Sequence, residues 1–138
     1  MERKYLIATH GYFANGLQSS LDILADKGKE VTVINAYVDD QDYLPQIERF
    51  FDTVAENQQA FIFTDLFGGS VNQNIVRLLA ERQQANITLI SNVNLAIILS
   101  IMFSSQDYLD KDCIQAMINE SAVNMVNLAA NNQEEDFF

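Results

Sequence analysis

The residues with the most chemical potential follow two short apolar runs of the chain. His10, the only histidine among 138 residues, directly follows the run Tyr5–Thr9 and stands before Gly11. Asp65 directly follows a second run, Ala60–Thr64. Imidazole can act as nucleophile, acid or base near neutral pH. A carboxylate beside it fixes the tautomer and leaves the other ring nitrogen free to attack. His10 and Asp65 are therefore a candidate catalytic pair.

Small residues that could hold an anion follow both candidates. After Asp65 the sequence Gly68-Gly69-Ser70 leads into a helical pattern, and the loop after Gly11 leads into another. The unpaired N–H groups at a helix start bind phosphate. Ser70 and Gln73 have the spacing of a capping box, so Ser70 is expected to cap its helix. The pattern suggests a histidine that carries a phosphoryl group, supported by Thr9, Gly11, Gly68, Gly69, Ser70 and Asn94.

Strand-like runs and helical stripes alternate along the chain and must position these residues. The expected strands are Tyr5–Thr9, Val31–Ile34, Ala60–Thr64 and Ile87–Ile90. The expected helices carry apolar stripes at three- and four-residue steps, at Leu17/Leu21/Leu24, Ile47/Phe50/Phe51/Val54, Val71/Ile75/Leu78/Leu79, Leu95/Ile98/Leu99/Met102 and Ile114/Met117/Ile118/Ser121/Met125. Gly28 is expected to end the first helix as its C′ residue. The last helix is expected to begin near Asp107 or Asp110.

This alternation predicts an α/β fold with a doubly wound, mainly parallel sheet of four to five strands and helices on both faces. In the flavodoxin-like strand order the first and third strands are neighbours. That order would bring His10 and Asp65 to one crevice, with Asn92 and Asn94 at the next position. We expect Asp65 to accept Nδ1–H of His10, which leaves Nε2 as the attacking nitrogen.

Composition limits the classes of function that fit. A hydrophobic fraction of 49% is typical of a globular chain, and we expect one domain at residues 1–127 with an acidic, flexible tail at 128–138. The net charge of −11 argues against binding to nucleic acid or to anionic lipid. The single cysteine, Cys113, fits a reducing cytosol, and one cysteine with one histidine predicts no metal site. The longest apolar stretch, Leu95–Phe103, is about half a membrane span. No signal peptide is recognised at the start, and no cofactor is implied.

The same apolar stretch also bears on oligomeric state. Ile97, Ile98, Ile101, Met102 and Phe103 leave the fourth helix little polar surface. A helix that is apolar nearly all round is buried in a core or against a partner. We therefore expect a homodimer.

From Tyr5 to about Asn127 the sequence resembles the enzyme IIA domains of the mannose family of the bacterial sugar phosphotransferase system. Its strongest marks are Thr9-His10-Gly11, the run Asp65-Leu66-Phe67-Gly68-Gly69-Ser70, and Val93-Asn94-Leu95. The chain departs from the family pattern at Val71 and Ala96, where proline is frequent, and at Asn92, where glycine is common.

The resemblance implies a cytoplasmic phosphotransferase. In that family the histidine at the position of His10 takes a phosphoryl group from phospho-HPr and passes it to enzyme IIB for sugar uptake. The aspartate at the position of Asp65 orients and stabilises the histidine. Partners are then HPr, enzyme IIB and a second copy of the chain, and contact with the membrane is only indirect, through the enzyme II complex.

Two other functions are compatible with the same residues. Ser70, His10 and Asp65 could form the triad of a hydrolase, although Ser70 lies in no Gly-x-Ser-x-Gly elbow. Alternatively, the chain could be a non-catalytic regulator that has kept the fold. Retention of both His10 and Asp65 favours the phosphoryl carrier over either alternative.

Overall fold

The computed structural model describes residues 1–129. The tail expected at 128–138 therefore lies outside the described residues, apart from its first two positions. The elements in chain order are β1 (Arg3–His10), α1 (Phe13–Ala25), the 3₁₀ turn η1 (Gly28–Glu30), β2 (Val31–Ala36), α2 (Leu44–Thr53), β3 (Gln59–Thr64), α3 (Ser70–Arg82), β4 (Ile87–Ile90), α4 (Leu95–Met102) and α5 (Lys111–Glu120).

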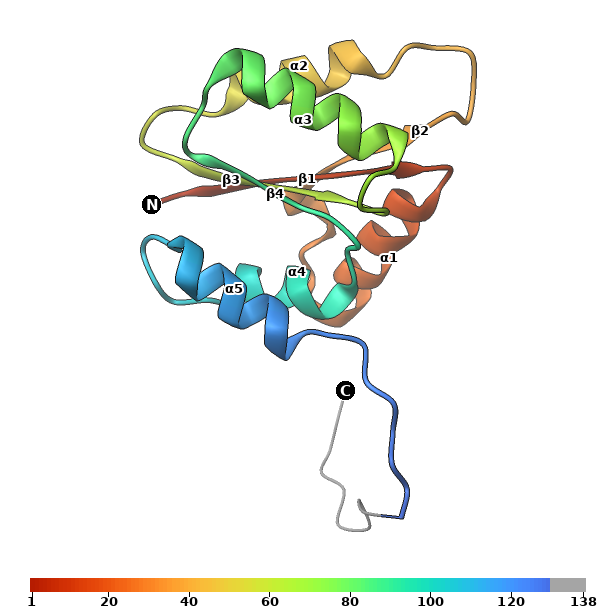
Figure 1. The fold of residues 1–138 in the computed structure, drawn as a ribbon, viewed down its shortest axis with the longest axis vertical. Coiled ribbons are helices and arrows are strands. Elements are labelled where there is room, and N and C mark those ends of the chain that lie inside the picture. The colour runs from red at the N-terminus through yellow and green to blue at the C-terminus, as the bar shows by residue number, and fades with distance from the viewer. Residues whose placement is uncertain (130–138) are drawn as a thin grey trace.

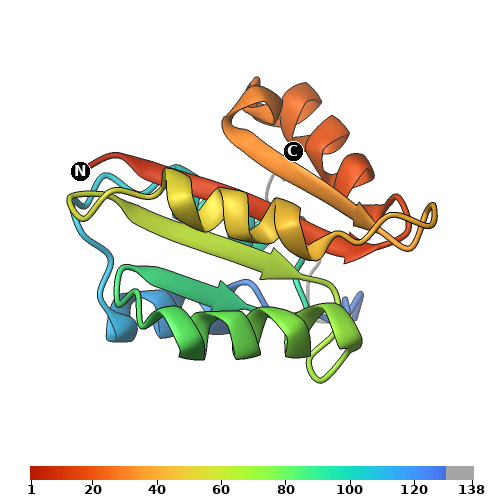
Figure 2. The same cartoon turned by 90° about the horizontal axis from the view of Figure 1, so that it is seen from above.

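The four strands form one parallel sheet in the order β2-β1-β3-β4. All four point the same way, so their carboxyl ends meet at one edge of the sheet (Figure 2). This confirms the predicted α/β class and the flavodoxin-like neighbourhood of the first and third strands. Within residues 1–129 no fifth strand is present, and the segment 104–108 is irregular, with a bend at 107–108.

Helices cover both faces of the sheet, α2 and α3 on one side and α1, α4 and α5 on the other (Figure 1). Successive side chains of a strand point to opposite faces. Leu6 and Ala8 of β1 accordingly pack with α2 and α3, whereas Tyr5 and Ile7 pack with α1, α4 and α5. Every residue of β3 is buried, because this strand is covered on both faces and paired on both edges.

The apolar character of α4 has an internal cause. Ile97, Ile98, Ile101 and Met102 are all buried in the core of a single chain, and only Phe103 is exposed. The core therefore accounts for the pattern, which gives no independent support for a dimer. None of the helices in residues 1–129 is both long and apolar enough to cross a membrane.

Two helix ends differ from the sequence expectation. Gly28 does not end α1, because Asp26 takes the left-handed conformation there with φ 55°. Gly28 is small for another reason: a Cβ on it would stand 2.8 Å from the Cβ of Asp22. The last helix begins after Asp110, whose Oδ1 accepts from the N–H of Cys113. That helix ends at Glu120, so Met125 lies beyond it and is exposed.

Candidate functional site

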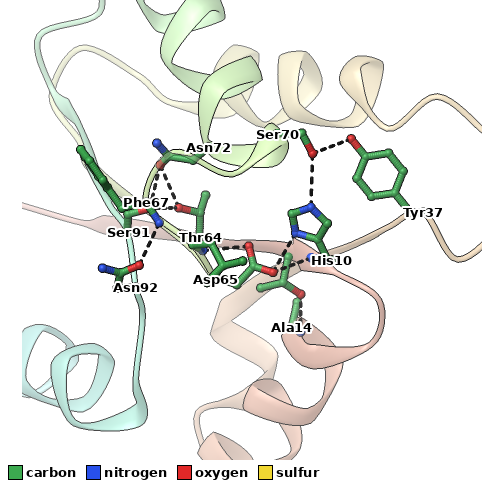
Figure 3. Close-up of polar contacts among 12 residues, drawn as sticks. His10, Ala14, Tyr37, Thr64, Asp65, Phe67, Ser70, Asn72, Ser91 and Asn92 are labelled. Atoms are coloured by element: carbon green, nitrogen blue, oxygen red, sulfur yellow. Dashed lines mark hydrogen bonds and ion pairs between the residues drawn. The ribbon is translucent and has the colours of Figure 1, made fainter. Parts of the chain in front are cut away.

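His10 and Asp65 meet at the carboxyl edge of the sheet because β1 and β3 are neighbours (Figure 3). Asp65 Oδ2 accepts the backbone N–H of His10 and lies 2.9 Å from its Nδ1. The other carboxylate oxygen, Oδ1, accepts from the N–H of Leu66. A carboxylate can only accept, so Nδ1 carries the ring proton and Nε2 keeps its lone pair. The His10 side chain is 40% exposed, against 12% for Asp65.

The charge state of Asp65 reflects two opposing effects. Burial alone would raise the pKa of Asp65, but the hydrogen bonds from the backbone and ring of His10, with the positive charge that the ring can take, lower this pKa below its usual value. Asp65 is therefore anionic at neutral pH. A fixed negative charge faces Nδ1 and stabilises any cation that forms on the ring.

Ser70 occupies the other side of the ring. Its Oγ lies 3.2 Å from Nε2 of His10. The capping box predicted for Ser70 and Gln73 is wrong, because α3 begins at Ser70 and its N-cap is Gly69. The side chain of Gln73 instead donates to the carbonyl of Gly68. With no capping role, the Ser70 hydroxyl is free to face the histidine.

The glycine turn shapes an open helix start beside Nε2. Gly68 has φ +80°, a conformation that favours glycine, and Gly69 passes close enough that a Cβ would lie 3.6 Å from Cε1 of His10. Within residues 1–129 the N–H groups of Ser70, Val71 and Asn72 have no hydrogen-bond acceptor. Such a helix start is suited to an anion.

The start of α1 is built differently. The buried Oγ1 of Thr9 accepts from the N–H of Ala14 at 2.7 Å, and Asn35 Oδ1 accepts from the N–H of Asn15. Two donors of the first turn are thus already satisfied. Gly11 has φ +62° and donates its N–H to the carbonyl of Ala36, which turns the chain out of β1.

Two asparagines after β4 hold backbone. Asn94 caps α4 by accepting from the N–H of Ile97, and its amide donates to the carbonyl of Ser121. Within residues 1–129 these hydrogen bonds of Asn94 go to backbone groups away from His10 and Asp65. Asn92 has φ +54° and accepts from the N–H of Phe67. Asparagine tolerates this left-handed conformation, so Asn92 can stand where the family commonly has glycine.

Sequence reasoning missed Tyr37, which stands directly after β2. Its hydroxyl lies 2.9 Å from Ser70 Oγ and 3.2 Å from the hydroxyl of Tyr43. Its ring centroid lies 5.3 Å from that of His10. The available signal was its position, since the strand order brings the end of β2 next to the end of β1.

A second group missed from the sequence is a polar cluster beneath the glycine turn. Asn72 Oδ1 accepts from the hydroxyls of Thr64 and Ser91 at 3.0 and 2.9 Å. Thr64 belongs to β3, Asn72 belongs to α3, and Ser91 lies in the turn after β4. The cluster therefore ties together the elements that position Asp65 and Ser70 (Figure 3).

The groups around Nε2 are hydroxyls and N–H donors, which match an anion. Among residues 1–129 no group of three or more histidine, cysteine or acidic side chains is arranged to hold a metal ion. The arrangement can therefore present a nucleophilic nitrogen next to donors for a tetrahedral anion.

Comparisons with known proteins place the chain in a family. Residues 4–118 match the family model EIIA-man, described as the fructose IIA component of the phosphotransferase system. A search of curated proteins gives no match. A Klebsiella pneumoniae structure described as a candidate permease of the phosphoenolpyruvate-dependent sugar phosphotransferase system is 31% identical, covers 88% of this chain and 84% of its own, and has a TM-score of 0.70.

Two further structures are similar to the chain. Component EIIA from Streptococcus agalactiae is 25% identical with a TM-score of 0.72, over 93% of this chain and 98% of its own. A mannose/sorbose-specific IIA subunit from Enterococcus faecalis is 17% identical with a TM-score of 0.74, over 93% and 97%. The latter similarity concerns the fold alone.

Proposed function

The chain belongs to the EIIA-man family of phosphotransferase-system IIA components, and from this premise we propose that it is a phosphoryl carrier that accepts phosphate from phospho-HPr on His10 and passes it to enzyme IIB. The observation that carries the proposal is the 2.9 Å contact between Nδ1 of His10 and Asp65 Oδ2, which leaves Nε2 unprotonated.

The transfer needs no proton to leave His10. The lone pair of Nε2 forms a bond to phosphorus while the P–N bond of the donor phosphohistidine breaks, and that bonding pair returns to the donor's ring nitrogen. Nδ1 keeps its proton, so the phosphorylated ring is a cation. Asp65 is anionic and faces this cation. Transfer to enzyme IIB is the same exchange in reverse.

The phosphoryl group carries up to two negative charges, in a protein of net charge −11. Local donors must therefore offset the repulsion. The start of α3 supplies the free N–H groups of Ser70, Val71 and Asn72, and the Ser70 hydroxyl lies beside Nε2. Preorganised donors of this kind are a principal means of stabilising transferred charge.

The surface around His10 supports docking of proteins rather than of a small substrate. Large apolar side chains stand exposed just after β1, β2 and β3, in the loops and at the first residue of α1, namely Tyr12, Phe13, Tyr37, Val38, Leu66 and Phe67. Exposed apolar groups gathered on one face are typical of interaction surfaces. Three cavities of about 280 to 590 Å³ are lined by other residues and do not include His10.

One observation favours a second candidate, a hydrolase with Ser70 as nucleophile. Asp65, His10 and Ser70 are connected in the order of a catalytic triad. The family membership favours the carrier, and the two candidates differ in the residue that becomes modified.

We extend the proposal to the protein's organisation. The family resemblance supports a cytoplasmic protein that acts as a homodimer, with residues 1–127 as one domain and 128–138 as a tail.

The experiment is incubation with enzyme I, HPr and phosphoenolpyruvate, followed by mass spectrometry. The wild type is expected to gain one phosphoryl mass that is labile in acid and stable in base, as a phosphoramidate is. His10→Ala is expected to gain none, and Ser70→Ala is expected to remain modifiable. Acid-stable label, or label that persists in His10→Ala, would contradict the carrier and favour Ser70 as nucleophile.

A further inference from the structure

Tyr37 adopts a backbone conformation that large side chains rarely take. Its φ is +67°, in the left-handed region, although it is an aromatic residue outside any helix or strand. Such outliers persist where surrounding contacts hold them, and they gather at functional sites. Here the conformation places the Tyr37 ring near His10 and its hydroxyl on Ser70 (Figure 3).

The hydrogen bonds around Tyr37 form a chain whose direction can be worked out from His10. Nδ1 of His10 donates to Asp65, so Nε2 of the neutral ring can only accept. The hydroxyl of Ser70 must then donate to Nε2. The Ser70 hydroxyl has only this one proton. Its oxygen must therefore accept from Tyr37, and the Tyr37 hydroxyl donates.

The far end of the chain agrees with this direction. Tyr37 has used its proton on Ser70, so it accepts from the hydroxyl of Tyr43. Tyr43 in turn accepts from the side-chain amide of Asn74 at 2.7 Å. An amide N–H can only donate, so the Tyr43 oxygen accepts from Asn74 and its proton stays available for Tyr37, which is compatible with the direction set from His10.

The pKa shifts of Tyr37 and Tyr43 agree with this direction of donation. Burial, followed by the bond to Tyr37, raises the pKa of Tyr43 to about 12. The hydroxyls of Ser70 and then Tyr43, which can donate to a phenolate, lower the pKa of Tyr37. Tyr43 therefore keeps its proton as the donor, and Tyr37 ionises before it.

We propose that Tyr37 is a positioning residue that aims the Ser70 hydroxyl at Nε2 of His10, and then at the phosphoryl group once Nε2 is bonded to phosphorus. The second half of this inference rests on the proposed phosphoryl-carrier function. Phosphorylation removes the lone pair that Ser70 donates to. The Ser70 proton turns to a phosphoryl oxygen, while Tyr37 still donates to Ser70 and keeps the hydroxyl in place.

The kinetic test compares Tyr37→Phe with Tyr108→Phe and Ser70→Ala. Tyr37→Phe keeps the ring and removes the donor, and it should slow phosphoryl gain from phospho-HPr about three- to tenfold, the typical effect of one hydrogen bond. Tyr108→Phe is the matched control, since Tyr108 is exposed and lies in the segment that Arg3 contacts at the start of β1, the opposite end of this strand from His10. It should transfer at the wild-type rate, with circular dichroism as the folding check.

A double variant tests whether Tyr37 acts through Ser70. If it does, Tyr37→Phe/Ser70→Ala should transfer no more slowly than Ser70→Ala alone, because the hydroxyl that Tyr37 aims is already missing. Multiplicative losses in the double variant, or a wild-type rate for Tyr37→Phe, would overturn the proposal.

A spectroscopic test needs no phosphoryl transfer and separates this inference from the proposed function. When Tyr37 ionises, its phenolate accepts the Ser70 proton and Nε2 loses its donor. The ¹⁵N resonance of Nε2 should therefore move as Tyr37 ionises, at a pH below the range in which Tyr43 titrates, in the wild type and in Tyr108→Phe. It should stay constant in Tyr37→Phe. Equal movement in Tyr37→Phe would overturn the inference, whereas an inert His10 in the transfer assay would overturn only the carrier function.

Discussion

One oxygen of Asp65 holds both the backbone and the side chain of His10. Oδ2 accepts both the backbone N–H and the ring Nδ1–H of the same residue. The first bond fixes where β1 ends relative to β3, and the second fixes the ring and its tautomer. The oxygen is held in place by the backbone bond, so a rotation of the ring would break the bond from Nδ1–H to this oxygen. The histidine is therefore oriented by the same contact that holds the backbone.

Asp65→Asn should separate orientation from charge. An amide can still accept one of these bonds, but it carries no charge and can present its NH₂ to the ring, which selects the wrong tautomer. We expect phosphoryl gain from phospho-HPr to fall by about 10²- to 10⁴-fold, as for the carboxylates of catalytic triads, with an unchanged circular dichroism spectrum. A wild-type transfer rate would remove Asp65 from the mechanism.

Asp65→Asn also tests how the free energy of unfolding depends on pH. The pKa of Asp65 is lowered in the folded chain, so its carboxylate stabilises the fold above its unfolded pKa of about 3.9, and this contribution is lost as pH falls through the folded pKa. Urea unfolding should give a difference between wild type and Asp65→Asn that is constant near neutral pH and shrinks below about pH 4. A difference that grows on acidification would contradict the assigned direction.

At the scale of elements, the two helix starts near His10 differ in what they can bind. In α1 the hydroxyl of Thr9 and the amide oxygen of Asn35 already accept two first-turn N–H groups. In α3 the N-cap is Gly69, which has no side chain to accept. We infer that α3 holds the phosphoryl group and that Thr9 serves the fold.

Thr9→Val tests this division. Valine has the shape of threonine but cannot accept from Ala14, so a buried N–H loses its partner at a cost of about 1–3 kcal/mol in the free energy of unfolding. Phosphoryl gain by the folded variant should stay near the wild-type rate. Thr88→Val in β4 is the matched control, because Thr88 is half-buried in the next-but-one strand of the sheet, away from the start of α1. A large loss of phosphoryl transfer without a loss of stability would indicate that Thr9 contributes to the phosphate site.

What could be predicted from the sequence at this scale depended on local patterns. The four strands and five helices follow from apolar periodicity, and the alternation of the two fixes a parallel sheet. The meeting of His10 and Asp65 then needed only the strand order. The prediction that Gly28 ends the first helix is wrong because glycine is favoured for two different reasons. One is a left-handed conformation at a helix end, the other is close packing against a neighbouring side chain, and the sequence does not distinguish them.

The rest of the site depends on contacts that no local pattern encodes. The role of Ser70 turned on a one-residue difference in where α3 begins. Tyr37 entered the site through a backbone conformation unusual for tyrosine, and its partners Tyr43 and Ser70 come from the start of α2 and the start of α3. Such a network is set by side-chain directions after the elements have packed.

At the scale of the whole molecule, the segment after α5 leaves the body of the chain without forming a helix or strand over 122–129 (Figure 1). Four of its apolar side chains are largely exposed, namely Val123, Met125, Val126 and Leu128. Apolar surface left in water is unfavourable, at about 25 cal/mol for each Å². We propose that a second copy of the chain covers these side chains in a homodimer, which replaces the argument that α4 no longer supports.

Replacing these four apolar residues by serine should therefore weaken the homodimer. Static light scattering at tens of micromolar is expected to give twice the mass of one chain for the wild type and a monomer for the fourfold variant, because serine removes the apolar surface that association would bury. Ile23→Ser is the matched control: Ile23 is 83% exposed on α1, far from this segment in sequence, and its loss should leave the dimer intact. Phosphoryl gain on His10 should survive in the monomeric variant, since Asp65 and Ser70, which contact the two ring nitrogens, belong to the same chain as His10. A wild type that is monomeric at this concentration would refute the homodimer, and a fourfold variant that stays dimeric would move the interface away from 122–129.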